Sequence, residues 1–303
     1  MARPFHTLDV FTSIAMEGNP LAVVLEADGL DAAGMQKIAR EFNLSETVFV
    51  LEPNDPVNTA RIRIFTPVRE LPFAGHPIVG TAALLGILRA PQLMARADIG
   101  VVIEAKVGLV HCTVRHLRGQ AVRASFTLPV LPQRTGEAAG NDAIAAALGL
   151  SPDDIGFDNH YPTLFSAGVP YTCVPLKSRA ALAAVRPDAR CWNAAFGGNE
   201  HKSAFLYTRG TAQADNDFAT RMFFPLTSLV EDPATGSAAA AFAGVVALFD
   251  RPVEGDHTLV LEQGFDMGRP SLITLGLELA NGELAAASIG GHSIMVMKGT
   301  LEI

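Results

Sequence analysis

Two segments of the chain repeat one pattern, and this repeat limits the folds that the sequence can adopt. Pro72–Leu85 reads PFAGHPIVGTAALL and Leu229–Phe242 reads LVEDPATGSAAAAF, so that HP-x-x-GTA is echoed by DP-x-x-GSA. Pro77 and Pro233 are 156 positions apart, which is about half of the 303 residues. The sequence therefore predicts two structurally similar halves, because the repeats of a solenoid would be much shorter.

Each repeated segment predicts a buried helix. Pro77 and Pro233 both precede an Ala-rich apolar run, and proline suits the first turn of a helix because its missing N–H costs nothing there. The second run, expected as a helix over 234–249, is apolar on all sides, as in a helix that other structure encloses. Unpaired N–H groups at a helix N-terminus can bind a carboxylate or phosphate. We expect such donors at Gly80, Thr81, Gly236 and Ser237.

Strands and one more helix are expected around these two helices in each half. Asp31 is predicted to cap a helix that ends near Asn43, with apolar residues at helical spacing. Alternating patterns predict strands over 5–11, 21–25, 47–51, 60–65, 98–104, 108–117, 121–128, 171–175, 203–208 and 220–224, and a short helix over 142–148. The repeat predicts domains over residues 1–118 and 119–292.

The composition excludes several classes of partner. The chain is 49% hydrophobic and 18% charged with a net charge of −8, and it has no Lys/Arg stripe. Nucleic acid and anionic membranes are therefore poor partners. The three scattered cysteines and the absence of an apolar leader predict a reduced, cytoplasmic protein. The histidines do not have metal-ligand spacing and no phosphate-binding or nucleophile-elbow motif is found, so no metal is expected.

Three polar residues are candidates for chemistry. Glu46 stands in NLSETVFVL directly before apolar residues, where a buried carboxylate would suit a proton carrier, although a solvated loop glutamate or a cap is the plain alternative. His76 and Asp232 occupy equivalent places before the two prolines. Asp232 could be an ordinary helix cap, whereas histidine is a poor one. Together the three groups suit proton transfer on a small carboxylic acid bound at helix N-termini.

Motifs along nearly the whole chain carry a resemblance to a known family. FHTLDVFT, GNPLAVVL, FNLSETVFV, RIFTP, ELPFAGHPIVGTA, EDPATGSA and EQGFDMGRPS resemble the PhzF-like isomerases of phenazine biosynthesis, in the diaminopimelate-epimerase-like superfamily. The resemblance implies an α+β fold of two pseudo-symmetric domains. Each would be a barrel-like, mostly antiparallel sheet around a central helix, with the active site in the interdomain cleft. The C-terminal strand, 293–303, would cross back to the first domain.

The resemblance also implies roles for individual residues. It implies that Glu46 is the proton shuttle, with His76 and Asp232 as the other catalytic groups. The residues that it implies for substrate binding are Gly75, Gly236 and Ser237, with Ser45 and Asn19 also inside the family motifs. It implies no cofactor, and we expect a homodimer.

The predicted function is a cofactor-independent isomerase that moves a proton within a small carboxylate. One alternative is a two-base amino-acid epimerase, but that reaction uses two cysteines in the superfamily, and here His76 and Asp232 hold the corresponding positions. The other alternative is a protein that binds a small carboxylate without catalysis. In the isomerase, His76 and Asp232 are expected to face each other across the cleft, each beside its own helix N-terminus.

Overall fold

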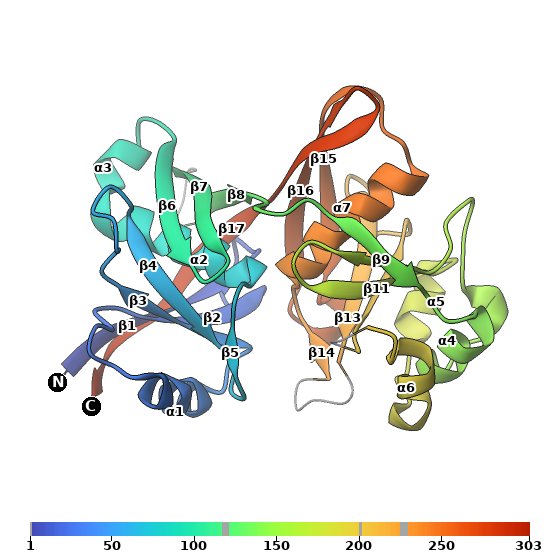
Figure 1. Ribbon diagram of the computed structural model, residues 1–303, viewed down its shortest axis with the longest axis horizontal. Helices are drawn as coiled ribbons and strands as arrows, with labels where there is room; N and C mark the ends of the chain where they lie inside the picture. The colour runs from blue at the N-terminus through green and yellow to red at the C-terminus, as the bar shows by residue number, and fades with distance from the viewer. Residues whose placement is uncertain (1, 117–120, 200–201, 225–229) are drawn as a thin grey trace. The chain divides into compact units, whose positions relative to one another are not determined.

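The computed structural model describes residues 2–116, 121–199, 202–224 and 230–303 (Figure 1). Two units make up the chain: Met1–Pro129 together with Ile289–Ile303, and Val130–Ser288. The two ends of the chain lie side by side in the first unit, where Ala2 is opposite Glu302 (Figure 1). The expected strand end at Leu117 and the expected domain boundary between residues 118 and 119 lie outside the described residues.

The first unit is a closed barrel of eight strands. Its strands are β1 (Ala2–Val10), β2 (Asn19–Val24), β3 (Glu46–Leu51), β4 (Ala60–Phe65), β6 (Ile99–Ala105), β7 (Gly108–His116), β8 (Val122–Thr127) and the C-terminal part of β17 (Glu283–Glu302), with the short β5 (Glu70–Leu71) beside β4. They pair in the order β1-β2-β3-β4-β6-β7-β8-β17, and β17 returns to β1. Only the β2–β3 and β4–β6 pairs of this barrel are parallel. The expected barrel-like, mostly antiparallel sheet is confirmed.

The helix α2 (Gly75–Arg89) is the centre of this unit, and Gly75–Gly86 are all buried. Gly80 faces β1 and β2 so closely that a Cβ atom there would lie 2.6 Å from Leu21 Cδ2 and 2.7 Å from Val10 Cγ2. Gly80 and Thr81 therefore belong to the interior of the helix. The expectation that their N–H groups form an anion site is wrong, because the helix begins five residues earlier, at Gly75.

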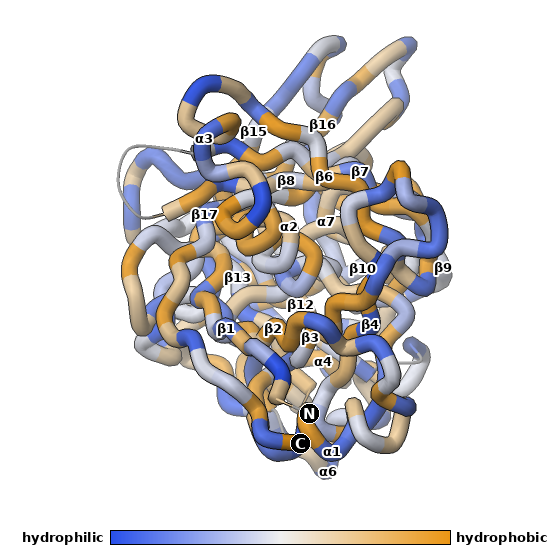
Figure 2. Tube along the Cα trace, turned by 90° about the vertical axis from the view of Figure 1, so that its left-hand side faces the viewer, coloured by the Kyte–Doolittle hydropathy of each residue, from blue (hydrophilic) through white to orange (hydrophobic). Residues whose placement is uncertain are grey.

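The helix α1 (Ala32–Phe42) lies outside the barrel and begins and ends as the sequence predicts. The Asp31 side chain accepts a hydrogen bond of 2.7 Å from the Gly34 N–H, and Asn43 ends the helix in the left-handed conformation at φ 51°. Its buried residue Met35 packs with Phe49 and Phe65 of the sheet. The other helix here is the short α3 (Pro91–Met94). On β4 the charged Arg61 and Arg63 alternate with buried isoleucines, as the changing colours along the strands in Figure 2 illustrate.

The second unit repeats this strand order around a second central helix. Its elements are β9 (Gln133–Glu137), α4 (Asn141–Leu148), the 3₁₀ turn Pro152–Asp154, β10 (Thr163–Ser166), β11 (Pro170–Pro175), α5 (Arg179–Ala184), α6 (Ala189–Phe196), β12 (Ala204–Thr208), β13 (Phe218–Phe223), β14 (Glu231–Asp232), α7 (Gly236–Phe249), β15 (Gly255–Gln263), the 3₁₀ turn Phe265–Met267, β16 (Ser271–Ala280) and the first part of β17. The strands pair in the order β9-β10-β11-β12-β13-β15-β16-β17, with β11–β12 and β13–β15 parallel.

Side chains repeat together with the strands. Glu104 at the end of β6 accepts hydrogen bonds of 2.9 Å from the N–H groups of Asn54 and Asp55. Glu262, 158 positions later on β15, accepts bonds of 2.7 and 2.8 Å from the N–H groups of Ala212 and Gln213. A carboxylate therefore fixes the loop that precedes β4 in the first unit and the loop that precedes β13 in the second.

Candidate active site

Three polar side chains from separate elements meet in the first unit. Asn19 is the first residue of β2, Glu46 is the first residue of β3, and His76 lies in the first turn of α2. The parallel register of β2 and β3 places Leu21 opposite Glu46, so both strands start at the same end of the barrel. The sheet topology brings Asn19 and Glu46 to the helix terminus that carries His76.

A glycine turn makes this position of Asn19 possible. Gly18 has φ 65°, in the left-handed region that glycine adopts readily. A Cβ atom at Gly18 would lie 2.3 Å from the Val10 carbonyl oxygen and 2.6 Å from Thr12 Cγ2. The chain can therefore return from β1 to β2 at this point only with glycine, and Asn19 enters the sheet fully buried.

His76 contacts both other residues through its two ring nitrogens. Its Nε2 lies 3.3 Å from Glu46 Oε2, and its Nδ1 lies 3.4 Å from Asn19 Nδ2. The His76 side chain is 4% exposed and that of Glu46 is 16% exposed. The His76–Glu46 contact lacks the alignment of a hydrogen bond, and such contacts are often loose until substrate binds.

Burial decides the charge of His76. It lowers the pKa of the ring from 6.5 to about 3, so His76 is neutral at physiological pH. The contact with Glu46 is therefore a neutral imidazole against a carboxyl group and not an ion pair, in spite of the short distance. The tautomer with the ring proton on Nε2, toward Glu46, is the one that lets Nδ1 accept from the Asn19 amide nitrogen and makes both contacts favourable.

The other two candidates of this unit flank the same residues. Ser45 is half-buried in the turn that follows α1 and directly precedes Glu46. Gly75 is the first residue of α2 and is buried. Because Pro77 has no N–H, the backbone donors at this helix start are those of Gly75 and His76.

In the second unit the candidates gather at the start of α7. Asp232 ends β14 and is 6% exposed, and Gly236 and Ser237 are the first two residues of the helix. The first helical N–H bonds run from Ala238 and Ala239 to the Thr235 carbonyl. The N–H groups of Gly236 and Ser237 precede them, at the place where a helix leaves donors for an anion.

The expected start of this helix at 234 is wrong. Thr235, with φ −112° and ψ 87°, is the N-terminal cap, so α7 begins three residues after Pro233 and two residues later than expected. The N–H of Thr235 donates to Gln263 Oε1 at 3.0 Å, and Gln263 Nε2 donates to the Asp232 carbonyl at 2.8 Å. These two bonds hold the segment from Asp232 to Thr235 in an extended turn.

Sequence reasoning missed the residues that fix this turn. Thr235 donates its hydroxyl to Asp232 Oδ2, and Gln263 bonds to both residues. Tyr171 on β11 lies 2.6 Å from Ser237 Oγ through its hydroxyl. Thr235 and Gln263 stand inside the motifs EDPATGSA and EQGFDMGRPS, and this was the available signal. Nothing in the sequence pointed to Tyr171.

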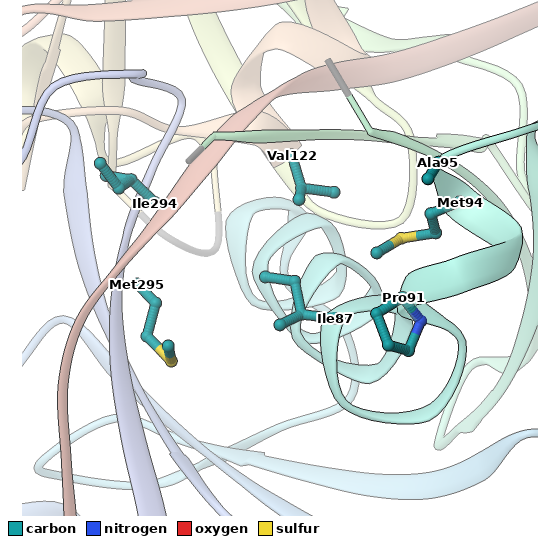
Figure 3. A pocket seen from close by; sticks show the side chains of 7 residues that line it. All are labelled: Ile87, Pro91, Met94, Ala95, Val122, Ile294 and Met295. Carbon is teal, nitrogen blue, oxygen red and sulfur yellow. The ribbon is translucent and has the colours of Figure 1, made fainter. Parts of the chain in front are cut away.

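Two cysteines of the chain are buried, and the first unit contains a cavity. Cys112 is on β7 and Cys173 on β11, both buried, and burial raises the pKa of Cys112 to about 12. A cavity of about 420 Å³ is lined by Ile87, Pro91, Met94, Ala95, Val122, Ile294 and Met295, whose side chains are drawn in Figure 3. It adjoins the C-terminal end of α2, whereas His76 lies in the first turn of this helix, about 17 Å from Ile87 at 1.5 Å per residue. Its lining has no titratable group.

Across the parts of the chain that the structure describes, no helix is long and apolar enough to span a bilayer. The same residues contain no group of three or more His, Cys, Asp and Glu side chains placed to hold a metal ion.

The sequence is similar to one protein family over nearly its whole length. Residues 8–299 match the PhzC-PhzF family, described as phenazine biosynthesis-like protein. The chain is 47% identical to an uncharacterized isomerase of Mesorhizobium japonicum, with 99% of each chain covered. It is 37% identical to the trans-2,3-dihydro-3-hydroxyanthranilate isomerase of Pseudomonas fluorescens, with 97% of each chain covered.

Solved structures share the fold. The crystal structure of a Bacillus anthracis phenazine biosynthesis protein of the PhzF family superposes with a TM-score of 0.88 at 24% identity, and 100% of both chains is covered. A hydroxyproline epimerase from Agrobacterium vitis gives a TM-score of 0.63 at 13% identity over 99% of this chain and 92% of the epimerase. The diaminopimelate-epimerase-like fold expected from the sequence is therefore confirmed.

Proposed function

Because the chain belongs to the PhzC-PhzF family of phenazine biosynthesis-like proteins, and its Mesorhizobium japonicum and Pseudomonas fluorescens relatives are isomerases, we propose that it moves a proton within a small cyclic carboxylate. The substrate class is that of trans-2,3-dihydro-3-hydroxyanthranilate, the compound named for the Pseudomonas fluorescens relative. Glu46 carries the proton. The observation that supports this most strongly is the buried, neutral His76 with its Nε2 3.3 Å from Glu46 Oε2.

The reaction needs only one group that both accepts and returns a proton. The Glu46 carboxylate takes a proton from one ring carbon, and the electron pair of that C–H bond moves into the double bonds of the ring. Protonated Glu46 then delivers a proton to another ring carbon, and deuterium from D₂O enters the ring when the Glu46 carboxyl proton exchanges with solvent before that step. The composition of the substrate does not change, and no oxidant, reductant or co-reactant takes part.

His76 holds Glu46 in position without competing for the proton. A protonated histidine beside Glu46 would bind the carboxylate as an ion pair, whereas the lowered pKa of His76 keeps the ring neutral. The Nε2–H then offers one hydrogen-bond donor to Glu46 in either protonation state of the carboxyl group. This arrangement suits a carboxyl group that must cycle between its two forms.

The start of α7 supplies the anion-binding groups of the proposal. The N–H groups of Gly236 and Ser237, with the Ser237 hydroxyl, suit the substrate carboxylate, since the helix dipole favours a negative charge there. Asp232 acts on the polar substituents of the ring. The participation of Asp232 with Glu46 and His76 on one substrate, the cytoplasmic location and the homodimer stay predictions.

Solvent isotope exchange tests the role of Glu46. Wild-type protein and the Glu46→Gln variant are incubated with trans-2,3-dihydro-3-hydroxyanthranilate in D₂O, and turnover and ring deuteration are followed by NMR. The variant is expected to lose roughly 10³-fold or more in kcat, because an amide cannot carry the proton. Glu41→Gln, which changes an exposed glutamate on α1, is the matched control and retains activity. Unchanged turnover in Glu46→Gln refutes the assigned role.

Two further assays on the wild-type protein separate the alternative functions. An amino-acid epimerase would invert a stereocentre, which chiral chromatography of an amino-acid panel detects. A protein that only binds the carboxylate would give a saturable binding isotherm and no product. A wild-type protein that neither isomerises nor exchanges protons of the dihydroanthranilate would contradict the proposed substrate class.

A further inference from the structure

Gln263 is a buried glutamine whose amide is hydrogen-bonded on both sides. It is the last residue of β15 and is 1% exposed. Its Oε1 accepts from the Thr235 N–H at 3.0 Å. Its Nε2 donates to the Asp232 carbonyl at 2.8 Å and to Thr235 Oγ1 at 3.0 Å.

These bonds determine the direction of the next one. The Thr235 N–H can only donate, so the side-chain oxygen of Gln263 must face it and the amide cannot be flipped. Thr235 Oγ1 therefore accepts from Gln263 and turns its own proton to Asp232 Oδ2. The order of donation is Gln263 to Thr235 to Asp232, so the Thr235 hydroxyl holds Oδ2 of Asp232.

These bonds among Gln263, Thr235 and Asp232, called the latch below, belong to the second half of the repeat only. Ala105 ends β6 as Gln263 ends β15, 158 positions later, and Val79 stands 156 positions before Thr235. Neither alanine nor valine has a side chain that can hydrogen-bond. The next residue, Gly264, is packed so tightly that a Cβ atom would lie 2.6 Å from the Pro233 carbonyl oxygen. The chain is built to bring the end of β15 against the turn that carries Asp232.

We propose that Gln263 is a positioning residue of the isomerase: through Thr235 it sets the orientation of the Asp232 carboxyl group and of the N–H groups at the start of α7. This inference rests on the proposed function, in which Asp232 and the α7 terminus meet the substrate. Gln263 itself does not touch the substrate. A competing explanation is that Gln263 only stabilises the turn.

Four variants separate positioning from plain stabilisation. Gln263→Leu removes every bond of the amide at nearly constant volume. Thr235→Val removes only the hydroxyl, and Thr235→Ser restores it. Gln263→Glu keeps an acceptor for the Thr235 N–H. The ionised glutamate has no donor in the place of Nε2, whereas the protonated glutamate can donate there. Gln133→Leu, at an exposed glutamine on β9, is the control for the substitution itself.

The expected results are kinetic. With trans-2,3-dihydro-3-hydroxyanthranilate, Gln263→Leu and Thr235→Val each lower kcat/KM by roughly 10- to 100-fold, the usual effect of removing a group that orients a functional residue. The kcat/KM of Thr235→Ser stays within about threefold of that of the wild type. The double variant Gln263→Leu, Thr235→Val loses little more kcat/KM than either single variant, because the two bonds act in series. Gln263→Glu gains activity relative to wild type as the pH falls, since its protonated form donates again.

A second readout does not depend on turnover. The ¹³C chemical shift of the Asp232 carboxyl group is followed against pH in the wild type, Gln263→Leu and Thr235→Val. The positioning role predicts that both variants displace the titration of Asp232 in the same direction, while Gln133→Leu leaves it unchanged. If the wild type does not isomerise the substrate, the proposed function fails and this titration alone decides on the latch.

Two outcomes overturn the inference. One is a Gln263→Leu variant with a lower Tm but with kcat/KM and the Asp232 titration unchanged, which leaves only a structural role. The other is a Thr235→Val variant that behaves as Thr235→Ser. This valine and serine pair carries the test if Gln263→Leu does not fold, because it leaves the two backbone bonds of Gln263 intact.

Discussion

The side-chain amide nitrogen of Asn19 lies 3.4 Å from Nδ1 of His76, on the side of the ring opposite to Glu46. A neutral imidazole carries its proton on one nitrogen only, so a donor at Nδ1 places the proton on Nε2. Asn19 thereby determines what His76 presents to Glu46. Asn19 can in this way influence Glu46 through the tautomer of His76.

Replacing Asn19 tests this relationship. Asn19→Leu keeps the approximate shape but removes the donor, so the neutral ring is no longer held in the Nε2–H form. We expect kcat to fall roughly 10- to 100-fold with a smaller change in KM. The measurement is steady-state kinetics, with the His76 tautomer read from ¹⁵N NMR. Asn193→Leu, at an exposed asparagine on α6, is the control. Wild-type kcat in Asn19→Leu would contradict the assignment.

His76 predicts a dependence of stability on pH. Its pKa is about 3 in the folded protein and near 6.5 when the chain is unfolded, because burial disfavours the charged ring. Between these values the unfolded state binds the additional proton. The contribution of His76 is therefore complete above about pH 6.5 and is lost as the pH falls toward 3, with a slope of up to about 1.4 kcal/mol per pH unit.

Urea unfolding between pH 4 and pH 7 measures that slope. His76→Gln cannot take up a proton, so its free energy of unfolding should change less steeply with pH than that of the wild type. His111→Gln, at an exposed histidine on β7, should keep the wild-type slope. Parallel curves for His76→Gln and the wild type would show that the ring is not buried in its neutral form.

Much of the fold was accessible from the sequence because its signals are local. The Asp31 cap, the αL end at Asn43 and the alternation over 60–65 each depend on residues close in the chain, and the structure has all three. The repeat of HP-x-x-GTA and DP-x-x-GSA indicated the second barrel-type half. The family resemblance predicted that the C-terminal strand returns to the first domain, which no periodicity in the sequence could indicate.

The errors lie where distant residues override a local pattern. Proline before an apolar run predicts a helix start, yet α7 begins only at Gly236. The cause is Gln263, 28 positions after Thr235, because its side chain accepts a hydrogen bond from the Thr235 N–H and donates one to the Asp232 carbonyl. The helices α5 and α6 were not predicted, although Trp192 and Phe196 pack in the core beside α4. These helices are too short, and have too few apolar residues, to show a helical period in the sequence.

The candidate site was predictable only as a set of residue types. The sequence named Asn19, Glu46 and His76 but gave no distance between them, since the parallel pairing of β2 with β3 creates their proximity. The tautomer of His76 and the latch of Gln263 both depend on side-chain amides in a buried setting. Hydrogen bonds of this kind connect residues tens of positions apart, so the motifs marked the residues but not the bonds between them.

Gly80 offers a test of the packing inside the first barrel. A methyl group there would lie 2.6 Å from Leu21 and 2.7 Å from Val10, so Gly80→Ala requires α2 to move away from β1 and β2. Overpacking of a core usually costs about 1–3 kcal/mol, and we expect a loss of free energy of unfolding in this range. Gly100→Ala, on β6 with no atom within 4 Å of the added methyl, should be nearly neutral. Chemical denaturation of both variants gives the comparison.

The thiols provide the last prediction, which bears on the two-base alternative. A cysteine acts as a base or nucleophile only as the thiolate. Burial raises the pKa of Cys112 to about 12 and raises that of Cys173 as well, so both are thiols at neutral pH. The double variant Cys112→Ala, Cys173→Ala should therefore retain kcat within about threefold, and iodoacetamide should label only the half-buried Cys191 in the folded protein, without loss of activity. A folded double variant that has lost turnover would restore the two-thiol epimerase, since the isomerase proposed here assigns no step to sulfur.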